Sequence, residues 1–244
     1  IDLQLKHWDA VQKAVSPPSV RMSLKDATIT SVEGITLKLT FASSFHREKI
    51  ADISQQDDER ILKFVRQQMP LVHAVVVEDY GKGVITASLI RAIVKLAKKH
   101  KKPVLVDPKE KNFSQYAGVT AVTPNRKEAI NSLNGRLRKH EAGIREVGAE
   151  LLKWLKCEAG LITLGEDGMA LFEKKGQVTE IPTAAREVFD VSGAGDTVIA
   201  VFGLALASGA TMREAAILSN IAAGIVVGKI GTATVIPHEI QRAV

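Results

Sequence analysis

The sequence predicts an α/β fold in which a mainly parallel sheet is covered by helices on both faces. From residue 55 onward, stretches with the apolar spacing of a helix alternate with short runs rich in β-branched residues. Such alternation of helices with buried strands is typical of parallel sheets. The chain has 244 residues, 45% of them apolar, which is enough to bury a full core. We therefore expect a single domain of the larger α/β kind.

The expected elements of this domain follow one another along the chain. Helices are predicted over 57–68, 86–100 and 140–157, and strands over 71–77, 103–107, 118–125 and 160–165. The segments MALFE and QVTEIP, joined across KKG, predict a hairpin. After residue 195 the chain is expected to be helical almost to its end, and small residues at 203–210 and 222–228 allow close helix packing. Ligands of such sheets collect at the carboxyl ends of the strands.

The first 54 residues follow a different pattern. The segments ATITSV and ITLKLTF, separated by Glu33-Gly34, predict a small antiparallel hairpin, and Pro17-Pro18 marks a loop before it. No complete βαβ unit is recognisable here. We therefore divide the chain into an incomplete N-terminal region, 1–54, and an α/β core, 55–244.

Composition argues against several classes of partner. The net charge is +6, but the densest basic cluster, at 95–103, closes a helix, where cations complement the exposed carbonyls. With 5% aromatic residues and no recognisable nucleic-acid module, nucleic-acid binding is not expected. No apolar run is long enough to span a bilayer, so we expect no membrane association. The single cysteine, Cys157, suits the cytoplasm and is expected to be a buried packing residue.

The segment DVSGAGDTVIA at 190–200 is a glycine turn that opens a helix. It does not match the dinucleotide fingerprint, because Val198 stands where the third glycine belongs, and GIVVGKI at 224–230 is one residue short of a P-loop. The remaining design is a helix start whose backbone amides bind a phosphoryl group in transit. A carboxylate there, Asp196, could take the proton of the attacking hydroxyl. An ordinary acid in the first turn of a helix explains Asp196 equally well.

Further segments match one known family. The DVSGAGD turn and the helix after it resemble the signature of the ribokinase-like carbohydrate kinases, also called the phosphofructokinase-B family. TPNRKE at 123–128, LITLGEDGMAL at 161–171 and LSNIAAGIVVGKIGTATV at 218–235 resemble three more elements of that family, in the same order. The resemblance covers residues 70–244. It implies a ribokinase-like fold, a lid remnant near the N-terminus, and ATP-dependent phosphoryl transfer to a sugar hydroxyl with Mg²⁺.

Within the family, three segments resemble the kinases of D-glycero-D-manno-heptose 7-phosphate: EDYGKGVIT at 78–86, VLVDPK at 104–109 and GKIGTATV at 228–235. Those kinases make the 1,7-bisphosphate on the route to the ADP-heptose of lipopolysaccharide cores, and many form the first half of a bifunctional protein with an adenylyltransferase. The resemblance implies ATP and a sugar phosphate as small-molecule partners. A homodimer is a further expectation, and another sugar or a nucleoside stays open as the acceptor.

The N-terminal region departs from the family pattern. Family members carry an acidic sugar-contacting loop and paired glycines that close over the sugar, whereas this sequence has no Gly-Gly pair and no glycine before Gly34. No adenylyltransferase half is recognisable either. We therefore expect either a piece of a longer protein or a degenerate ATP-binding protein without transferase activity.

The resemblance also implies roles for individual residues. The general base is Asp196, and the anion hole comprises Gly193, Ala194 and Gly195. Mg²⁺ and the phosphates would be organised, mostly through water, by Asn125 and Glu128, and the nucleotide contacted by Thr163, Gly165, Gly168 and Asn220. Phosphate contacts are Lys82 and Lys109, a sugar contact is Asp79, and a monovalent-cation site, for an ion such as K⁺, is formed by Asp190 and Ser192. Taken singly, each of these also fits a capping, turn or solvated loop residue.

Overall fold

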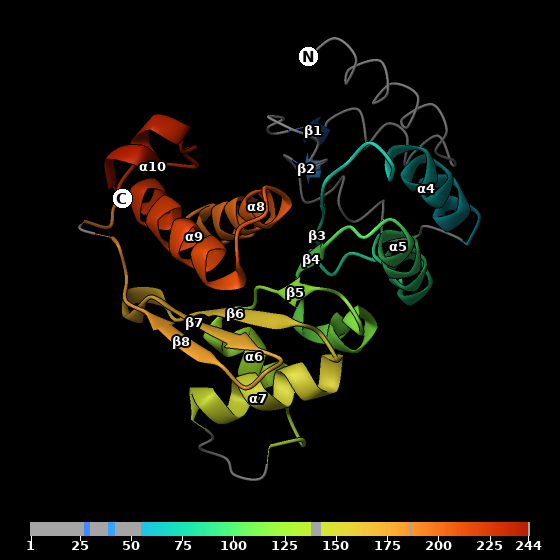
Figure 1. The fold of residues 1–244 in the computed structure, drawn as a ribbon, viewed down its shortest axis with the longest axis horizontal. Coiled ribbons are helices and arrows are strands. Elements are labelled where there is room, and N and C mark those ends of the chain that lie inside the picture. Colours follow the sequence, from blue (N-terminus) through green and yellow to red (C-terminus); the bar gives the residue numbers. More distant parts are fainter. Residues whose placement is uncertain (1–26, 30–38, 42–54, 138–142, 186, 244) are drawn as a thin grey trace.

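The computed structural model describes residues 27–29, 39–41, 55–137, 143–185 and 187–243. Its main feature is a six-stranded sheet with helices on both faces (Figure 1). The strands lie in chain order: β3 (Val75–Glu78), β4 (Val104–Asp107), β5 (Ala121–Val122), β6 (Ala159–Thr163), β7 (Met169–Glu173) and β8 (Val178–Ile181). Pairing is parallel from β3 to β6 and antiparallel from β6 to β8. The predicted fold class and the predicted hairpin of β7 and β8 are confirmed.

The helices fall where apolar periodicity and capping residues place them. They are α4 (Gln55–Gln68), α5 (Ala87–Lys99), η1 (Glu110–Tyr116), α6 (Arg126–Ser132), α7 (Ile144–Leu155), η2 (Gly165–Asp167), α8 (Ala194–Ala207), α9 (Met212–Val227) and α10 (Pro237–Ala243). The Thr86 hydroxyl oxygen caps α5 by accepting a hydrogen bond from the Leu89 amide at 3.1 Å. Helix α7 ends where Lys156 takes a left-handed conformation with φ +53°. The third predicted helix, 140–157, is therefore shorter in the structure.

The first predicted strand of the core, 71–77, is wrong over its first half. The amides of Leu71 and Val72 both donate to the Gln68 carbonyl, at 2.8 and 3.2 Å, so this segment closes α4 with a turn. The sheet begins when the Val75 amide donates to the Pro103 carbonyl at 2.9 Å. Apolar residues alone could not distinguish the end of a helix from the start of a strand at this point.

Side chains of successive strand residues pack into separate cores on the two faces of the sheet. On β4, Val104 and Val106 belong to a cluster with α5 and α7, whereas Leu105 belongs to a cluster with α8 and α9. A Cβ added to Gly203 of α8 would lie 3.0 Å from Val76 Cγ2, so the helix approaches the sheet closely. The small residues predicted to permit such packing do so here.

Cys157 is buried, as predicted. Burial is the main cause that raises the pKa of its thiol to about 12. A thiol that stays protonated is a poor nucleophile, which agrees with a packing role.

Two short strands are described in the N-terminal region. Strand β1 (Ala27–Ile29) pairs antiparallel with β2 (Leu39–Phe41), with Ala27 opposite Phe41. This confirms the predicted antiparallel pair, while Glu33-Gly34 and Pro17-Pro18 lie outside the described residues. The division of the chain at residue 54 stays a prediction.

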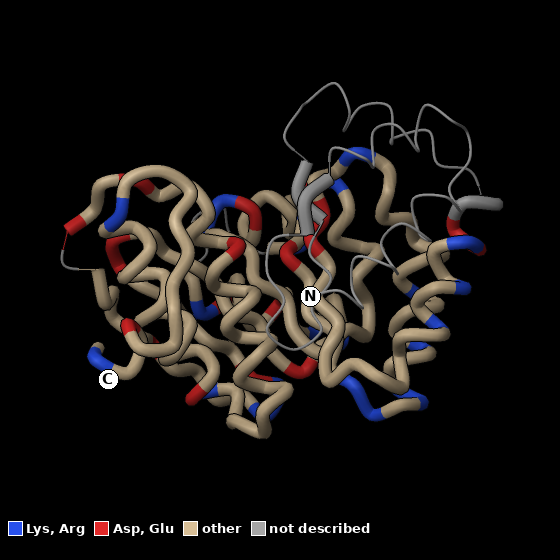
Figure 2. The backbone as a smooth tube through the Cα atoms, turned by 90° about the horizontal axis from the view of Figure 1, so that it is seen from above, with Lys and Arg blue, Asp and Glu red and all other residues tan. Residues whose placement is uncertain are grey.

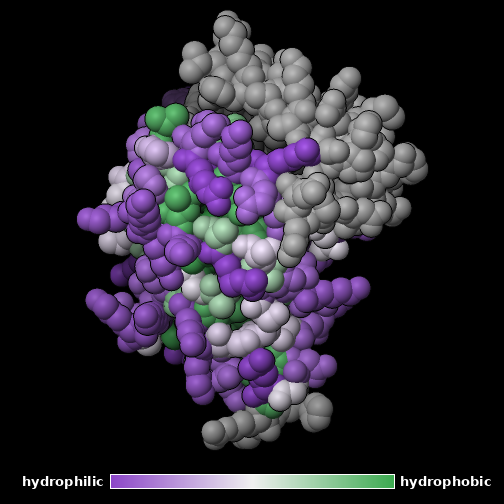
Figure 3. Space-filling model, turned by 90° about the vertical axis from the view of Figure 1, so that its right-hand side faces the viewer, coloured by the Kyte–Doolittle hydropathy of each residue, from purple (hydrophilic) through white to green (hydrophobic). Residues whose placement is uncertain are grey.

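Charges are distributed unevenly over the described chain. Lys and Arg positions follow α4 and α5 at one edge of the molecule, while Asp and Glu positions lie near the centre and towards the opposite side (Figure 2). Viewed from the side of α4 and α5, the surface is mainly hydrophilic, with smaller apolar areas between the polar side chains (Figure 3). Among the helices described, none combines the length and the apolar character needed to cross a bilayer.

Candidate active site

Acidic side chains meet at the carboxyl ends of β3 and β4. Glu78 and Asp107, the last residues of these strands, are register partners in the parallel ladder. Strand alternation places them on the same face as Val76 and Leu105, which is the face covered by α8. The first turn of α8 carries Asp196, a partly buried residue. The strands and this helix therefore bring three carboxylates to one edge of the sheet.

The pKa of Asp107 is raised by burial and by the other acids of this group. Burial is the largest cause that raises the pKa of its carboxyl to about 7, and repulsion from Glu128, Glu78 and Asp196 adds to the effect. The Thr123 hydroxyl, 3.3 Å from Asp107 Oδ1, acts in the opposite direction by stabilising the carboxylate. The clustered carboxylates create a negative electrostatic potential, which favours the binding of cations or of a ligand that carries bound cations.

Tyr80 borders the same group of carboxylates. Its hydroxyl donates to Glu78 Oε2 at 3.3 Å. Tyr80 is 40% exposed, and the burial of the rest of its side chain, followed by the charges of Glu78 and Asp196, raises the pKa of the phenol above its usual range. Tyr80 therefore stays a neutral hydrogen-bond donor beside the acids.

The start of α8 exposes backbone donors. Gly193 takes the left-handed conformation, φ +81°, and no side-chain oxygen of the described residues caps the helix. A Cβ added to Gly193 or Gly195 would meet no atom of the described chain within 4 Å. The Ala194 amide, predicted as a third anion donor, instead donates to the Val191 carbonyl at 3.2 Å. An anion at this helix start would therefore meet the amides of the two glycines.

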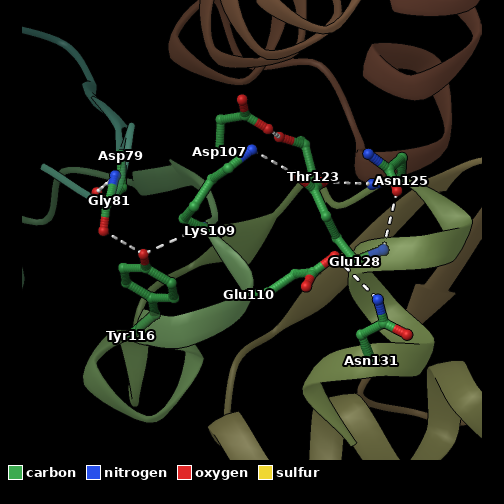
Figure 4. Close-up of polar contacts among 10 residues, drawn as sticks. All are labelled: Asp79, Gly81, Asp107, Lys109, Glu110, Tyr116, Thr123, Asn125, Glu128 and Asn131. Carbon is green, nitrogen blue, oxygen red and sulfur yellow. Dashed lines mark hydrogen bonds and ion pairs between the residues drawn. The ribbon is translucent and has the colours of Figure 1, made fainter.

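Asn125 and Glu128 form a reciprocal capping box at the start of α6. Asn125 Oδ1 accepts from the Glu128 amide at 2.9 Å, and Glu128 Oε2 accepts from the Asn125 amide at 3.1 Å. The other oxygen of Glu128 accepts from Lys109 Nζ at 3.1 Å (Figure 4). Oxygen donors suit Mg²⁺, but these are already engaged, and no group of three or more acidic, His or Cys residues in the described chain could hold a metal. The pair fits an ion held through water and phosphate rather than a protein cage.

The other predicted nucleotide contacts lie around the ends of β6 and β8. Thr163 ends β6 and bridges to Asn125, and Gly165 follows at φ +66° with open space at its Cβ position within the described chain. Gly168 is packed so tightly that an added Cβ would lie 2.2 Å from the Ile181 carbonyl oxygen. Asn220 is 6% exposed, and its Nδ2 donates to the Pro182 carbonyl at 2.7 Å. Gly168 and Asn220 thus pack against the end of β8 and stabilise it. Thr163 and Gly165 lie at the carboxyl end of β6.

Asp190 and Ser192 form a tight turn ahead of α8. The Asp190 carboxylate accepts from the Ser192 amide at 2.9 Å. Hydrogen bonds from Ser192 and then from the Gly231 backbone lower the pKa of Asp190. The turn is therefore joined to the loop that follows α9, and it presents an ionised carboxylate there.

The remaining predicted residues lie in the loops after β3 and β4. Lys82 is partly buried between Gly81 and Gly83, both of which have positive φ. The carboxylate of Asp79, a predicted sugar contact, is 5% exposed and accepts from the Gly81 amide and from the Tyr116 hydroxyl (Figure 4). It also accepts from Asn112 Nδ2. The structure thus gives Asp79 a role within the protein that sequence alone did not predict.

Four members of this constellation were not among the predicted site residues: Glu78, Tyr80, Asp107 and Tyr116. Two of them could have been found, because Glu78 and Asp107 are acids that follow the apolar runs VVV and VLV at the carboxyl ends of parallel strands. Tyr116 gave no such signal. Its contact with Asp79 spans 37 residues and depends on the docking of η1 against α5, α6 and α7.

Comparisons with known proteins identify the family of the chain. The family model for pfkB family carbohydrate kinases matches residues 21–239. The bifunctional protein HldE of Desulfatibacillum aliphaticivorans is 47% identical over 195 residues, which are 80% of this chain and 40% of that protein. The bifunctional protein HldE of Geobacter sulfurreducens is 42% identical over 226 residues, 93% of this chain and 44% of that protein. The chain thus spans less than half the length of these curated relatives.

Solved structures share the fold at lower identity. Arabidopsis thaliana ribokinase complexed with ribose and ATP superimposes with a TM-score of 0.61 at 22% identity, covering 78% of this chain and 59% of that chain. Phosphofructokinase-2 from Escherichia coli in complex with potassium gives a TM-score of 0.63 at 17% identity, covering 75% and 60% of the two chains. These likenesses show a ribokinase-like fold.

Proposed function

Because the chain belongs to the pfkB family of carbohydrate kinases, we propose that it transfers the γ-phosphoryl group of ATP to a sugar hydroxyl. The observation that carries this proposal is the start of α8, where Asp196 stands one residue beyond the uncapped glycine turn. An anion binder alone gains nothing from a carboxylate beside the bound anion. A carboxylate is useful there if it accepts a proton from the group that attacks the anion.

Asp196 acts as the general base in this proposal. It takes the proton of the acceptor hydroxyl as that oxygen attacks the γ-phosphorus, and the bond between the γ-phosphorus and the bridging oxygen of ADP breaks. The amides of Gly193 and Gly195 stabilise the charge on the transferring group, aided by the positive end of the α8 dipole. The proton, the phosphoryl group and the leaving ADP are then all accounted for.

Cations balance the charge of ATP at the acidic edge of the sheet. Lys109, whose ammonium lies 3.1 Å from Glu128 Oε1, would contact a phosphate oxygen. Asn125 and Glu128 would hold Mg²⁺ through water, and Mg²⁺ would neutralise phosphate charge during transfer. The carboxylates Glu78 and Asp107 then face a bound cation instead of one another.

The acceptor that the sequence favours is heptose 7-phosphate, with heptose 1,7-bisphosphate as the product. The segments EDYGKGVIT, VLVDPK and GKIGTATV support it by their resemblance to kinases of that substrate, and the curated relatives bear one common name. EDYGKGVIT and VLVDPK include the strand ends where Glu78 and Asp107 lie. The segments that favour this acceptor therefore include the loops that border the site.

Replacing Asp196 with Asn tests the proposal. The variant keeps the shape of the side chain but cannot accept a proton, so kcat should fall by roughly 10²–10⁴ while the Kd for ATP changes by no more than a few-fold. Turnover is measured by ADP release in the presence of sugar phosphate, and Kd by calorimetry. Near-normal turnover of the variant would make Asp196 an ordinary first-turn acid and remove the main support for the mechanism.

A further inference from the structure

Asp79 joins the loop after β3 to the loop after β4. Its Oδ1 accepts from the Gly81 amide at 2.6 Å, and its Oδ2 accepts from Asn112 Nδ2 at 2.8 Å and from the Tyr116 hydroxyl. Three donors on a carboxylate that is 5% exposed leave little capacity for an external hydroxyl. The carboxylate therefore works within the protein.

Tyr116 passes this connection on to the backbone of Lys109. The ring is fully buried in η1, and the hydroxyl oxygen accepts from the Lys109 amide at 3.3 Å while its proton goes to Asp79. Burial and then the hydrogen bond to Asp79 raise the pKa of Tyr116 above its usual range, so the hydroxyl keeps the proton that it donates. One phenol thus ties the start of one loop to the start of the next (Figure 4).

The side chain of Lys109, although 51% exposed, is contacted near its base and at its ammonium. Its stem passes over Gly81, where an added Cβ would lie 3.1 Å from Lys109 Cγ and where φ is +66°. Its ammonium lies 3.1 Å from Glu128 Oε1, on a residue that the capping box of α6 holds in place. The Asp79 loop therefore supplies the surface on which the Lys109 stem lies, and Tyr116 fixes the point where that stem begins.

We propose that Asp79 and Tyr116 are positioning residues for Lys109, holding its ammonium where an anionic phosphate of a nucleotide binds. The inference rests on the proposed function in that Lys109 is taken as a phosphate contact. It replaces the role of sugar contact that the sequence suggested for Asp79. Fixing a long flexible side chain in advance spares the loss of rotamer entropy that binding would otherwise cost.

A double-mutant cycle tests the positioning role. Tyr116→Phe removes the hydroxyl but keeps the buried ring, and Lys109→Ala removes the ammonium. Tyr116→Phe should weaken ATP binding about 3- to 30-fold in the native background and less than about twofold when Lys109 is already Ala, the range expected for residues that act through one another. Kd for ATP is measured by calorimetry, and Asp79→Asn is expected to show the same dependence on Lys109.

Thr120→Val is the matched control. It deletes a hydroxyl that accepts from the Val104 amide at 2.9 Å, at the opposite end of β4 from Lys109. It should give the same small change in Kd in both backgrounds, whatever its effect on Tm. The positioning role is overturned if Tyr116→Phe has an equal effect with and without Lys109, or if Lys109→Ala leaves the Kd unchanged. Because Kd requires no turnover, coupling without phosphoryl transfer would contradict the kinase proposal alone.

Discussion

Asp107 is a carboxyl group held where its charge is unfavourable. Its neighbours Glu78, Glu128 and Asp196 are all acids, and burial raises the pKa of Asp107 from 3.8 to about 7. Such a residue lowers stability in the absence of ligand, and a bound cation would relieve the repulsion. At the scale of single residues, the site therefore favours the binding of a positively charged ligand group at the expense of the stability of the free protein.

Asp107→Asn should stabilise the free protein in a pH-dependent way. A raised folded-state pKa favours the folded state fully below pH 3.8, and this contribution is lost as pH rises through about 7. The variant should therefore exceed the native protein in unfolding free energy at pH 8, by about 4 kcal/mol at most, and the difference should shrink towards pH 4. Denaturant unfolding at a series of pH values measures it.

Asp167→Asn controls for the loss of one negative charge. Asp167 forms an exposed ion pair with Arg126 at 2.7 Å, and its charge is not among those that raise the pKa of Asp107. A difference between Asp107→Asn and native protein that did not change between pH 4 and pH 8 would mean that Asp107 does not titrate in this interval.

At the scale of elements, the first turn of α8 combines two glycines of different kinds. Gly193 needs its left-handed conformation, whereas Gly195 has ordinary helical geometry, so a side chain at Gly195 causes no backbone strain. The lack of a side chain at Gly195 leaves open the space in which we place the transferring phosphoryl group.

Gly195→Ala should separate stability from function. Alanine favours a helix over glycine by up to about 1 kcal/mol, so Tm should rise slightly or stay constant. The added methyl group occupies the approach to the amide, so kcat/KM for ATP should fall at least tenfold. Calorimetric Tm and ADP-release kinetics measure the two effects. Unchanged kinetics in a stabilised variant would mean that no ligand approaches this turn.

The sequence predicted the elements well where local signals decide them. Strands β4 and β6 and helix α5 follow from β-branched runs, apolar spacing and the Thr86 cap. The start of β3 at Val75 could not be predicted, because it depends on which carbonyl accepts from the Leu71 and Val72 amides. The local pattern of apolar residues does not specify that partner. The Asp79–Tyr116 contact likewise depends on how η1 docks, so only the structure could show it.

At the scale of the whole molecule, the described core places the proposed nucleotide site along one edge of the sheet. The helix start at Gly193, the capping box at Asn125 and the loops after β3 and β4 all belong to that edge. The chain spans about 40% of the length of the relative from Desulfatibacillum aliphaticivorans.

We propose that a phosphoryl group passes from ATP to a sugar phosphate at this edge of the sheet. The direct measurement is phosphorus NMR of the protein incubated with ATP, Mg²⁺ and each member of a panel containing heptose 7-phosphate, fructose 6-phosphate, ribose and a nucleoside. We predict equimolar ADP and a new phosphate resonance on the anomeric oxygen of the heptose, absent with Asp196→Asn. Binding of ATP without transfer to any acceptor in the panel would contradict phosphoryl transfer by this protein.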